Sequence, residues 1–318
     1  MDAAGLAVPW VRGRSADLAP PDIVVAKGGS PAANCLAAVA ALGGFARFVH
    51  RGDRVVVKAN PTGTRPPEAA LSTHPELVAT VVRACREAGA SQVLVASHDD
   101  ARSFVATGIA AAGTSAGGTW EALEKRDRYR EVPVPRGRVL RREAIAIPVL
   151  EADVFINLPI VKQSPEVEIT VALKNLMGVN WDRLYYHRTD LNQCIAELTS
   201  VVPHDLVIAD ANYVLLTNGP LGPGEVLQAR QVIAGTDPVA VDAFCARFLN
   251  RTPEQVPAVR LAHELGIGRM DLAALRIQEV AVSGSARAAR GAPGRRPTAG
   301  IGTRPRGPYV PRRRRHPT

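Results

Sequence analysis

Short apolar runs that alternate with longer amphipathic segments restrict the fold of this chain more than any other feature. Residues 54–59 have the pattern of a buried strand, and a loop rich in Pro, Gly and Thr follows over residues 61–72. A helix with apolar residues on one face is expected from Pro75 to Gly89, and another strand over residues 92–96. Strand, loop, helix and strand in this order predict a right-handed βαβ unit.

The same alternation continues along the chain with one interruption. Further strands are expected near residues 153–158, 206–209, 232–235 and 277–282, and further helices near 34–49, 191–201, 237–248 and 258–265. Residues 99–151 are first rich in Gly and Ala and then charged, which predicts an irregular insertion or a small subdomain. The chain is therefore expected to have an α/β fold, with a mainly parallel sheet flanked by helices.

The net charge of +9 is concentrated at one end of the sequence. Ten arginines and no acidic residue lie from Gly284 to Thr318, so residues 1–283 carry a charge near −1. This tail is rich in Arg, Pro and Gly without hydrophobic periodicity, which predicts disorder. We expect an α/β domain over residues 1–283 and a disordered tail over residues 284–318. A solvated extension is the simplest interpretation of the tail, and nucleic acid could be bound through the tail only.

Cysteine spacing and hydropathy argue against several classes of protein. The four cysteines lie far apart and form no C-x-x-C pair, so an iron–sulfur cluster is not expected; they are Cys35, Cys85, Cys194 and Cys245. No apolar run reaches the roughly 18 residues that span a bilayer, and the N-terminus lacks the pattern of a signal peptide. No membrane partner is therefore expected, and a cytoplasmic location follows by default.

A divalent metal is left open by the sequence, and no other cofactor is identified. Potential oxygen and imidazole ligands are present at Asp99, Asp100, Asp210, Asp237, Asp242, His74 and His98. No two of them have a recognised metal-binding spacing, so no metal ligand is assigned. The G-x-S-x-G elbow of α/β hydrolases and the phosphate-binding loop of nucleotide hydrolases are also absent from the sequence.

Lysines and asparagines near the ends of the expected strands predict a binding site. Lys58 and Asn60 end one strand, Lys162 follows another, and Lys174 and Asn175 lie in an apolar segment. Open α/β sheets bind ligands at the carboxyl ends of their strands, and a buried charge is costly without a partner. We therefore expect a pocket for a small anion. Clustered lysines lower one another's pKa, so one could act as general base or amine nucleophile.

Two acidic candidates share the segment Gly235-Thr-Asp-Pro-Val-Ala-Val-Asp242. Pro238 suits the first helical position, which makes Asp237 the N-cap of a helix and explains this residue without a functional role. Nothing equally simple explains Asp242, so a functional role is favoured for Asp242 over Asp237. Either carboxylate could pair with the lysines or hold a divalent ion that bridges to an anion.

Taken together, these motifs resemble the domain of unknown function 362 family over roughly residues 23–282. The similar segments are Gly43-Gly44 with the strand ending at Asn60, Thr73-His-Pro75, Asn157-Leu-Pro-x-x-Lys162, Leu173-Lys-Asn-Leu-Met-Gly178, Asn218-Gly-Pro220 and Gly235 to Asp242. Many members carry a ferredoxin-like domain, for which this chain lacks the cysteines. Ala59 replaces a usual Pro, and Gln163 stands where a Thr-His pair often follows the lysine. Redox chemistry implied by the family is therefore not expected.

The sequence predicts a soluble α/β enzyme that acts on a small anionic metabolite through an undetermined reaction. The expected catalytic residues are Lys58, Lys162, Lys174 and Asp242, and the expected ligand- or cofactor-binding residues are Asn60, His74, Asn175, Asn218 and Asp237. One alternative is a non-catalytic anion-, metal- or cofactor-binding protein whose basic tail contacts nucleic acid or an acidic partner. Another is a buried network of ion pairs that only stabilises the fold.

Overall fold

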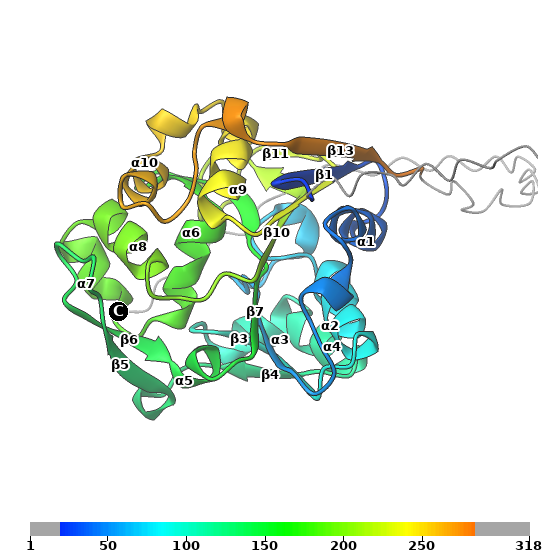
Figure 1. The fold of residues 1–318 in the computed structure, drawn as a ribbon, viewed down its shortest axis with the longest axis horizontal. Coiled ribbons are helices and arrows are strands. Elements are labelled where there is room, and N and C mark those ends of the chain that lie inside the picture. The colour runs from blue at the N-terminus through cyan, green and yellow to red at the C-terminus, as the bar shows by residue number, and fades with distance from the viewer. Residues whose placement is uncertain (1–19, 284–318) are drawn as a thin grey trace, which may run out of the picture. The chain divides into compact units, whose positions relative to one another are not determined.

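The computed structural model describes residues 20–283, so the predicted disordered tail lies outside the described residues. Within them, the main element is an 11-stranded mixed sheet (Figure 1). Its continuous path runs in the order β13 (Ile277–Ala281), β1 (Ile23–Lys27), β12 (Gln231–Gly235), β10 (Leu206–Leu215), β7 (Val154–Asn157), β2 (Arg54–Lys58), β3 (Gln92–Ser97) and β4 (Thr119–Ala122). Three short strands extend the sheet beside β10: β8 (Ile160–Ser164), β9 (Glu168–Thr170) and β11 (Val226–Leu227).

Strand direction divides this sheet into two parts. Strands β4, β3, β2, β7 and β10 pair in parallel, as the βαβ pattern predicted. In contrast, β12 is antiparallel to both of its neighbours, β10 and β1. The α/β fold class is therefore confirmed, with mostly parallel strands. The carboxyl end of β12, however, lies at the opposite edge of the sheet from the carboxyl ends of β2, β7 and β10.

Helices cover both faces of the sheet (Figure 1). The α-helices are α1 (Pro31–Ala41), α2 (Pro75–Glu87), α3 (Ala101–Ala106), α4 (Ile109–Ser115), α5 (Ile147–Leu150), α6 (Ala172–Asn175), α7 (Arg183–Arg188), α8 (Leu191–Thr199), α9 (Pro238–Cys245) and α10 (Pro257–Glu264). The 3-10 turns are η1 (Phe45–Arg47), η2 (Pro67–Ala69), η3 (Arg126–Arg128), η4 (Leu176–Val179), η5 (Ala246–Leu249), η6 (Pro253–Gln255) and η7 (Leu272–Ala274).

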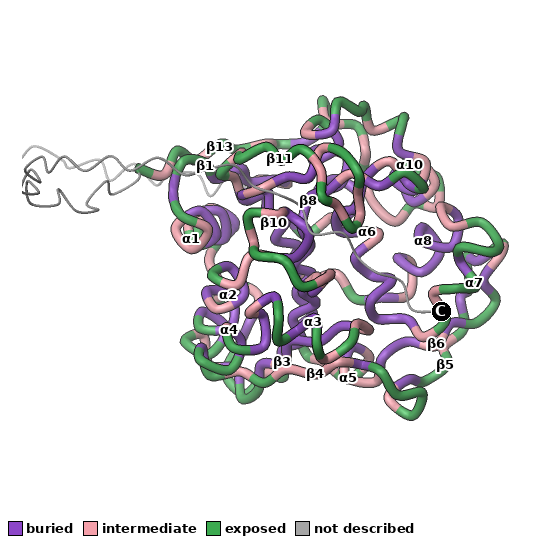
Figure 2. Tube along the Cα trace, turned by 180° about the vertical axis from the view of Figure 1, so that it is seen from behind, coloured by how far each residue is buried: buried purple, intermediate pink, exposed green. Residues whose placement is uncertain are grey.

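Two hydrophobic cores form because strand side chains alternate between the faces. In β2, Val55 and Val57 pack into the core under α1, α2 and α4. Val56, between them, packs into the core on the other face, to which α6, α8, α9 and α10 contribute. The strands between the two helical layers are accordingly buried along most of their length (Figure 2). This sandwich fixes the strand ends from which the site is built.

The region expected to be an irregular insertion is partly regular. Residues 101–122 form α3, α4 and β4, which adds a parallel strand to the main sheet beside β3. Only the following residues leave the sheet, and β5 (Tyr129–Pro133) and β6 (Arg142–Ala146) there form a separate antiparallel hairpin. The expectation missed β4 because its four residues, Thr-Trp-Glu-Ala, carry no apolar run and its side chains stay partly exposed.

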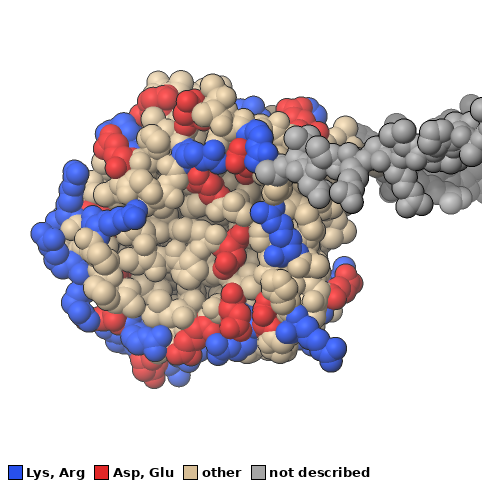
Figure 3. Space-filling model, in the orientation of Figure 1, with Lys and Arg blue, Asp and Glu red and all other residues tan. Residues whose placement is uncertain are grey.

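The four cysteines are all free and buried. No helix among residues 20–283 is long and apolar enough to cross a membrane. On the face drawn in Figure 3, charged side chains of both signs lie mostly around the margin, whereas uncharged residues fill most of the centre. The lysines predicted to form a site are hidden from such a surface view because Lys58 and Lys162 are only 1% exposed.

Candidate functional site

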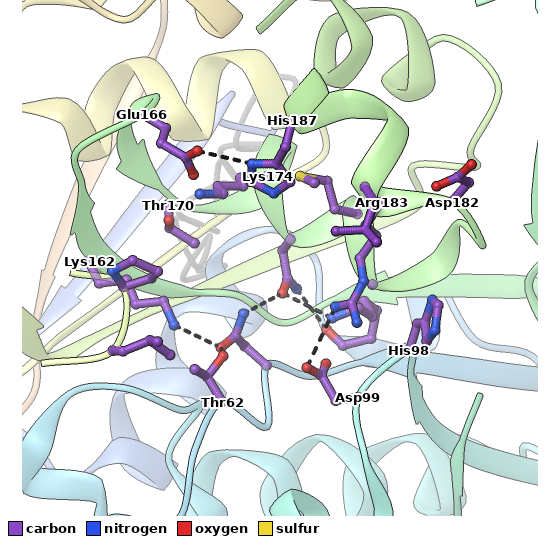
Figure 4. Close-up of a pocket in the computed structure, with 18 of the residues that line it drawn as sticks. Thr62, His98, Asp99, Lys162, Glu166, Thr170, Lys174, Asp182, Arg183 and His187 are labelled. Atoms are coloured by element: carbon purple, nitrogen blue, oxygen red, sulfur yellow. Dashed lines mark hydrogen bonds and ion pairs between the residues drawn. The ribbon is translucent and has the colours of Figure 1, made fainter. Parts of the chain in front are cut away.

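A cavity of about 800 Å³ lies where the chain leaves β2, β3 and β7 at their carboxyl ends. Its wall is completed by β8, β9, α6, η4, α7 and the loop over residues 217–224. Lys162, Thr170 and Lys174 lie on one side of the cavity, and His98, Asp99 and Arg183 lie on the other (Figure 4). The parallel strands place this cavity where open α/β sheets bind their ligands.

A chain of side-chain hydrogen bonds joins two lysines at the floor of the cavity. Lys58 Nζ donates to Asn175 Oδ1 at 3.0 Å, and Asn60 Nδ2 donates to the same oxygen at 3.1 Å. Lys162 Nζ in turn donates to Asn60 Oδ1 at 3.2 Å and to the carbonyl of Leu71 at 2.7 Å. Both amide groups are thereby fixed in orientation, with their oxygens toward the amines.

Asn175 is held from behind by the ends of two strands. Its Nδ2 donates to the carbonyl of Lys58 at 3.1 Å and to Asn157 Oδ1 at 2.8 Å. Asn157, the last residue of β7, donates in turn to the carbonyl of Ala172 at 2.9 Å. This network ties α6 to β2 and β7, so the floor of the cavity is rigid without a ligand.

The lysine side of the cavity contains an unused hydrogen-bonding group. Lys174 Nζ donates to Ser164 Oγ at 3.0 Å. Thr170, the last residue of β9, is buried and lines the cavity, yet its hydroxyl has no hydrogen-bond partner among the described residues. A buried hydroxyl without a partner is costly, which indicates that a bound group satisfies it. An anionic oxygen would accept from this hydroxyl and from the lysine amines together.

Burial lowers the pKa of the amines that surround the cavity. The pKa of Lys58 and the pKa of Lys162 each decrease from 10.5 to about 7, chiefly because burial disfavours the charged form. Asp99 opposes both shifts, whereas Arg183 adds to the first and the neighbouring lysines add to the second. Burial also lowers the pKa of Lys174. Two amines are thus half protonated near neutral pH.

The opposite wall contains a histidine in a defined tautomer. His98 Nδ1 lies 2.9 Å from the carbonyl of Asn180, which can only accept, so Nδ1 carries a proton. The ring stacks on Trp181, with centroids 5.3 Å apart and planes 6° apart, and burial lowers the pKa of His98. His98 is therefore neutral over most of the physiological range, and Nε2 is available as a proton acceptor. Beside it, Asp99 forms an ion pair with Arg183 at 3.8 Å.

The lysines themselves have no ion-pair partner. The carboxylates that line the cavity are already engaged, because Asp99 pairs with Arg183 and Glu166 lies 3.0 Å from His187 Nδ1. Among residues 20–283, neither Lys58, Lys162 nor Lys174 forms an ion pair. The three lysines thus do not belong to a network of buried ion pairs. Their positive charge is left for a ligand to compensate.

Close packing at Gly178 holds Lys58 in place. A Cβ atom at this glycine would lie 2.3 Å from Cε and 2.7 Å from Nζ of Lys58, and 2.6 Å from Ser97 Oγ. These distances are far below normal contact distances, so only glycine leaves room for the extended lysine side chain. The backbone of Gly178 also accepts a hydrogen bond from the amide of His98 at 2.6 Å.

Asp242 does not line the cavity but supports it from below. Its Oδ1 accepts from the amide of Ala172 at 2.7 Å, and its Oδ2 accepts from the amide of Leu173 at 3.1 Å. These are the first two amides of α6, which carries Lys174 and Asn175. Burial raises the pKa of Asp242 to about 7, although the two amides oppose this shift. Asp242 is therefore positioned to orient the helix, not to contact a ligand.

Asp237 lies away from the cavity because β12 is antiparallel to its neighbours. It follows the carboxyl end of β12, which is at the other edge of the sheet. Its Oδ1 accepts from the amides of Val239 and Ala240 as the N-cap of α9, and its Oδ2 accepts from the amide of Arg269 at 2.8 Å. The capping part of the prediction for Asp237 is thus present, whereas its approach to the lysines is not.

His74 and Asn218 also lie outside the cavity wall. The ring of His74 caps α2 by accepting from the amide of Glu76, and its own amide donates to buried Asp210 at 2.7 Å. Asn218 adopts a φ of 56° in the loop over residues 217–224 and donates to the carbonyl of Pro223. The next residues of this loop, Pro220 and Leu221, do line the cavity.

Sequence reasoning did not identify several residues of the cavity wall. Arg183, Leu184 and His187 come from α7, and Trp181 immediately precedes this helix. They follow the Leu173 to Gly178 motif by only a few residues, which is the one signal that could have found them. The focus on strand ends excluded them, since α7 approaches the site from the helical layer. No group of three or more His, Cys, Asp or Glu side chains that could hold a metal occurs within residues 20–283.

Two comparisons with individual proteins place this geometry among known chains. The thylakoid-associated protein sll1697 of Synechocystis sp. is 28% identical over 244 residues, which are 71% of this chain and 72% of that protein. The lactate racemase apoprotein from Thermoanaerobacterium thermosaccharolyticum has a TM-score of 0.46 at 11% identity. That match covers 71% of this chain and 56% of the racemase chain, so this chain spans little more than half the length of the solved structure.

A family model supplies the assignment that neither individual protein provides. The model described as a domain of unknown function (DUF362) matches residues 55–247. This range begins in β2 and ends beyond α9, so it contains Lys58, Lys162 and Lys174 together with the strands that position them. The motifs on which the sequence resemblance depended lie mostly within the same range. The chain belongs to the domain of unknown function 362 family.

Proposed function

We propose that this protein is an enzyme that binds a small carboxylate or phosphate in the lysine-lined cavity and transfers a proton on it. The observation that carries the proposal is the convergence of three lysines without an acidic partner on one cavity. Three buried cationic groups are costly unless a bound anion compensates them. The unpartnered hydroxyl of Thr170 beside Lys162 and Lys174 supports the same end of the cavity as the anion site.

The choice of lysine over arginine supports proton transfer in addition to binding. The chain contains 39 lysines and arginines, of which only five are lysines: Lys27, Lys58, Lys125, Lys162 and Lys174. Three of these five line the cavity. Arginine stays protonated in proteins, whereas a buried lysine can lose its proton near neutral pH. In a chain that otherwise uses arginine, lysine at these positions favours a role in which the amine exchanges a proton.

The roles follow from the contacts. Lys174 and Thr170 bind the anionic group of the ligand, since both face the cavity from the same side. A neutral amine, Lys58 or Lys162, accepts a proton from the carbon or oxygen next to that group. The other amine, protonated, donates to the atom that becomes electron-rich, and a pKa of about 7 suits both steps. Asn60 and Asn175 keep the two amines in position through their hydrogen bonds.

Deuterium exchange separates an enzyme from a carrier. The protein is incubated in D2O with a panel of hydroxy, keto and amino carboxylates and phosphate esters, and NMR detects deuterium next to the anionic group. We expect incorporation with at least one ligand, and loss of incorporation in Lys58→Met and Lys162→Met. Lys125→Met is the matched control, because Lys125 is exposed and does not line the cavity.

The result also decides between the proposed enzyme and the alternative binding protein. Native mass spectrometry of the freshly purified protein detects any ligand or metal that copurifies with it. Tight binding of an anion without deuterium exchange would favour a non-catalytic carrier. Absence of anion binding to the wild-type protein would contradict the anion site itself. The expected cytoplasmic location stays a prediction, and the relative from Synechocystis is described as thylakoid-associated.

A further inference from the structure

Exposed leucines form a rim at the mouth of the lysine-lined cavity. Leu184 on α7 is 63% exposed, and Leu221 in the loop over residues 217–224 is 65% exposed. Both line the same cavity as Lys58, Lys162 and Lys174. Single exposed leucines are common on protein surfaces, but two of the most exposed large apolar side chains of residues 20–283 border one charged cavity.

Leu221 is presented by an anchored loop. The amide of Gly219 donates to Gln163 Oε1 at 2.8 Å, which ties the loop to the residue that follows Lys162 in β8. A Cβ atom at Gly219 would lie 1.7 Å from the carbonyl oxygen of Gln163, so the loop packs directly on this strand. The position of Leu221 is therefore coupled to the strand that carries the anion-binding lysine.

The helix that presents Leu184 is anchored as well. Asp182 caps α7 by accepting from the amide of Tyr185 at 3.0 Å. Tyr186, on the buried face of the same helix, donates to Glu143 Oε2 at 2.7 Å. Both leucines consequently have fixed supports, and the apolar rim exists before any ligand binds.

The size of the cavity does not match a bare anion. About 800 Å³ is within the range of roughly 300–1,000 Å³ that pockets for drug-sized ligands occupy. A carboxylate or phosphate on Lys162, Lys174 and Thr170 would fill only one end. Met177 and Trp181 add apolar surface between that end and the rim.

We propose that the ligand is amphipathic, with its anionic group on Lys162, Lys174 and Thr170 and an apolar portion that extends past Met177 to Leu184 and Leu221. This inference rests on the proposed function for its anionic end and specifies the class of substrate. Burial of the apolar portion removes the two leucines from water together with the ligand. The ligand class is thus an organic acid or phosphate ester with a hydrocarbon or aromatic group of several carbons.

A homologous series of straight-chain carboxylates tests the apolar subsite. Binding of acetate, butanoate, hexanoate and octanoate is measured by titration calorimetry at pH 6.5, where the amines are mostly protonated. We expect the affinity to increase about threefold to fourfold for each added methylene until the chain reaches the rim. Leu184→Ser and Leu221→Ser should each lower octanoate affinity by about fivefold or more and leave acetate affinity nearly unchanged. Leu36→Ser is the control, because Leu36 is 50% exposed on α1 and does not line the cavity.

The outcomes separate this inference from the proposed function. If Lys162→Met abolishes acetate binding but chain length has no effect, the amphipathic ligand is excluded and the anion site stands. If Lys162→Met leaves the binding of all four acids unchanged, the anion site fails and the inference fails with it. Light scattering on the wild-type protein and both leucine variants checks the rim for self-association. A dimer that the leucine substitutions dissociate would identify a second copy of the chain as the occupant and overturn the inference.

Discussion

At the scale of single residues, Gly178 decides whether Lys58 can reach the cavity. Gly178→Ala should displace the lysine amine, because the new methyl group would overlap Cε and Nζ of Lys58. We expect anion affinity to decrease by about tenfold or more, and the free energy of unfolding by about 1–3 kcal/mol, as for other overpacked sites. Calorimetry with a carboxylate and urea unfolding measure the two effects.

A double variant tests whether Lys58 is the cause. In the Lys58→Ala background two of the three close contacts of the new methyl group are removed. Gly178→Ala should therefore cost less stability there than in the wild-type protein, which a double-mutant cycle measures. Equal costs in both backgrounds would show that the backbone, not the lysine, resists the substitution.

The shifted amines give the site a specific dependence on pH. Burial lowers the pKa of Lys58 and Lys162 from 10.5 to about 7, so the unfolded chain binds more protons than the folded one between these values. The free energy of unfolding should accordingly increase with pH over this range, by up to about 1.4 kcal/mol per pH unit for each lysine. Below pH 7 both states are protonated, and the full cost of the buried charges is present.

Anion binding should have the opposite dependence, since a carboxylate binds the protonated amines and its affinity decreases as the pH rises through 7. Urea unfolding and calorimetry from pH 6 to pH 10, on the wild-type protein and Lys162→Met, measure both slopes. The stability of the wild-type protein relative to Lys162→Met should increase with pH. A constant difference would show that Lys162 titrates like an exposed lysine, because its partners Asn60 and Leu71 do not titrate.

At the scale of secondary-structure elements, α6 depends on a carboxylate from another helix. Asp242 on α9 accepts from the first two amides of α6, and both of its oxygens are used. Asn at this position would turn an amide donor toward one backbone donor. Asp242→Asn should therefore lower the free energy of unfolding by about 1–3 kcal/mol and weaken anion binding, because α6 carries Lys174.

Asp237→Asn is the matched control on the same helix. Asn caps helices about as well as Asp, and the cap is remote from the lysines, so anion affinity should stay unchanged. Stability should decrease less than in Asp242→Asn, because only the contact with the amide of Arg269 is lost, at an exposed position. Thermal unfolding and calorimetry on both variants measure the contrast. Weaker anion binding in Asp237→Asn would require a contact between the two edges of the sheet that the structure does not show.

The polarity of the strands explains which site residues could be predicted from sequence. Lys58 and Lys162 follow strands of the parallel part of the sheet, and the βαβ pattern indicates that their carboxyl ends share one edge. The direction of β12 is not encoded in its own residues, because it depends on pairing with β10 and β1, which are distant in sequence. For the same reason, no local pattern reveals that Asp242 caps α6, 70 residues away.

For the whole molecule, the layered α/β fold was predictable because its signals are local. Periodicity marks the strands and helices, and their alternation implies a sheet covered on both faces. The cavity wall was predictable only where it derives from strand ends. Trp181, Arg183 and Leu184 enter through the packing of α7 on the rest of the chain, and this packing depends on contacts such as the one between Tyr186 and Glu143.

The basic tail provides a prediction on the same scale. Removal of residues 284–318 should leave the thermal unfolding midpoint nearly unchanged, because β13, the last described strand, ends at Ala281 and keeps its pairing with β1. The truncated protein should also lose any affinity for duplex DNA, since the tail contains ten arginines and the remainder is nearly neutral. Thermal unfolding and DNA titration at several salt concentrations check both statements. A midpoint lower by many degrees would show that the tail packs on the domain.

The concentration of lysines in one cavity also has a consequence for the chemical reactivity of the whole protein. An amine that is largely neutral at physiological pH is a nucleophile, whereas the exposed lysines and the many arginines of this chain remain protonated. Small electrophiles such as aldehydes and activated esters that can enter the cavity should therefore modify Lys58 and Lys162 in preference to the surface. A bound anion, by holding the amines protonated, would protect them from covalent damage.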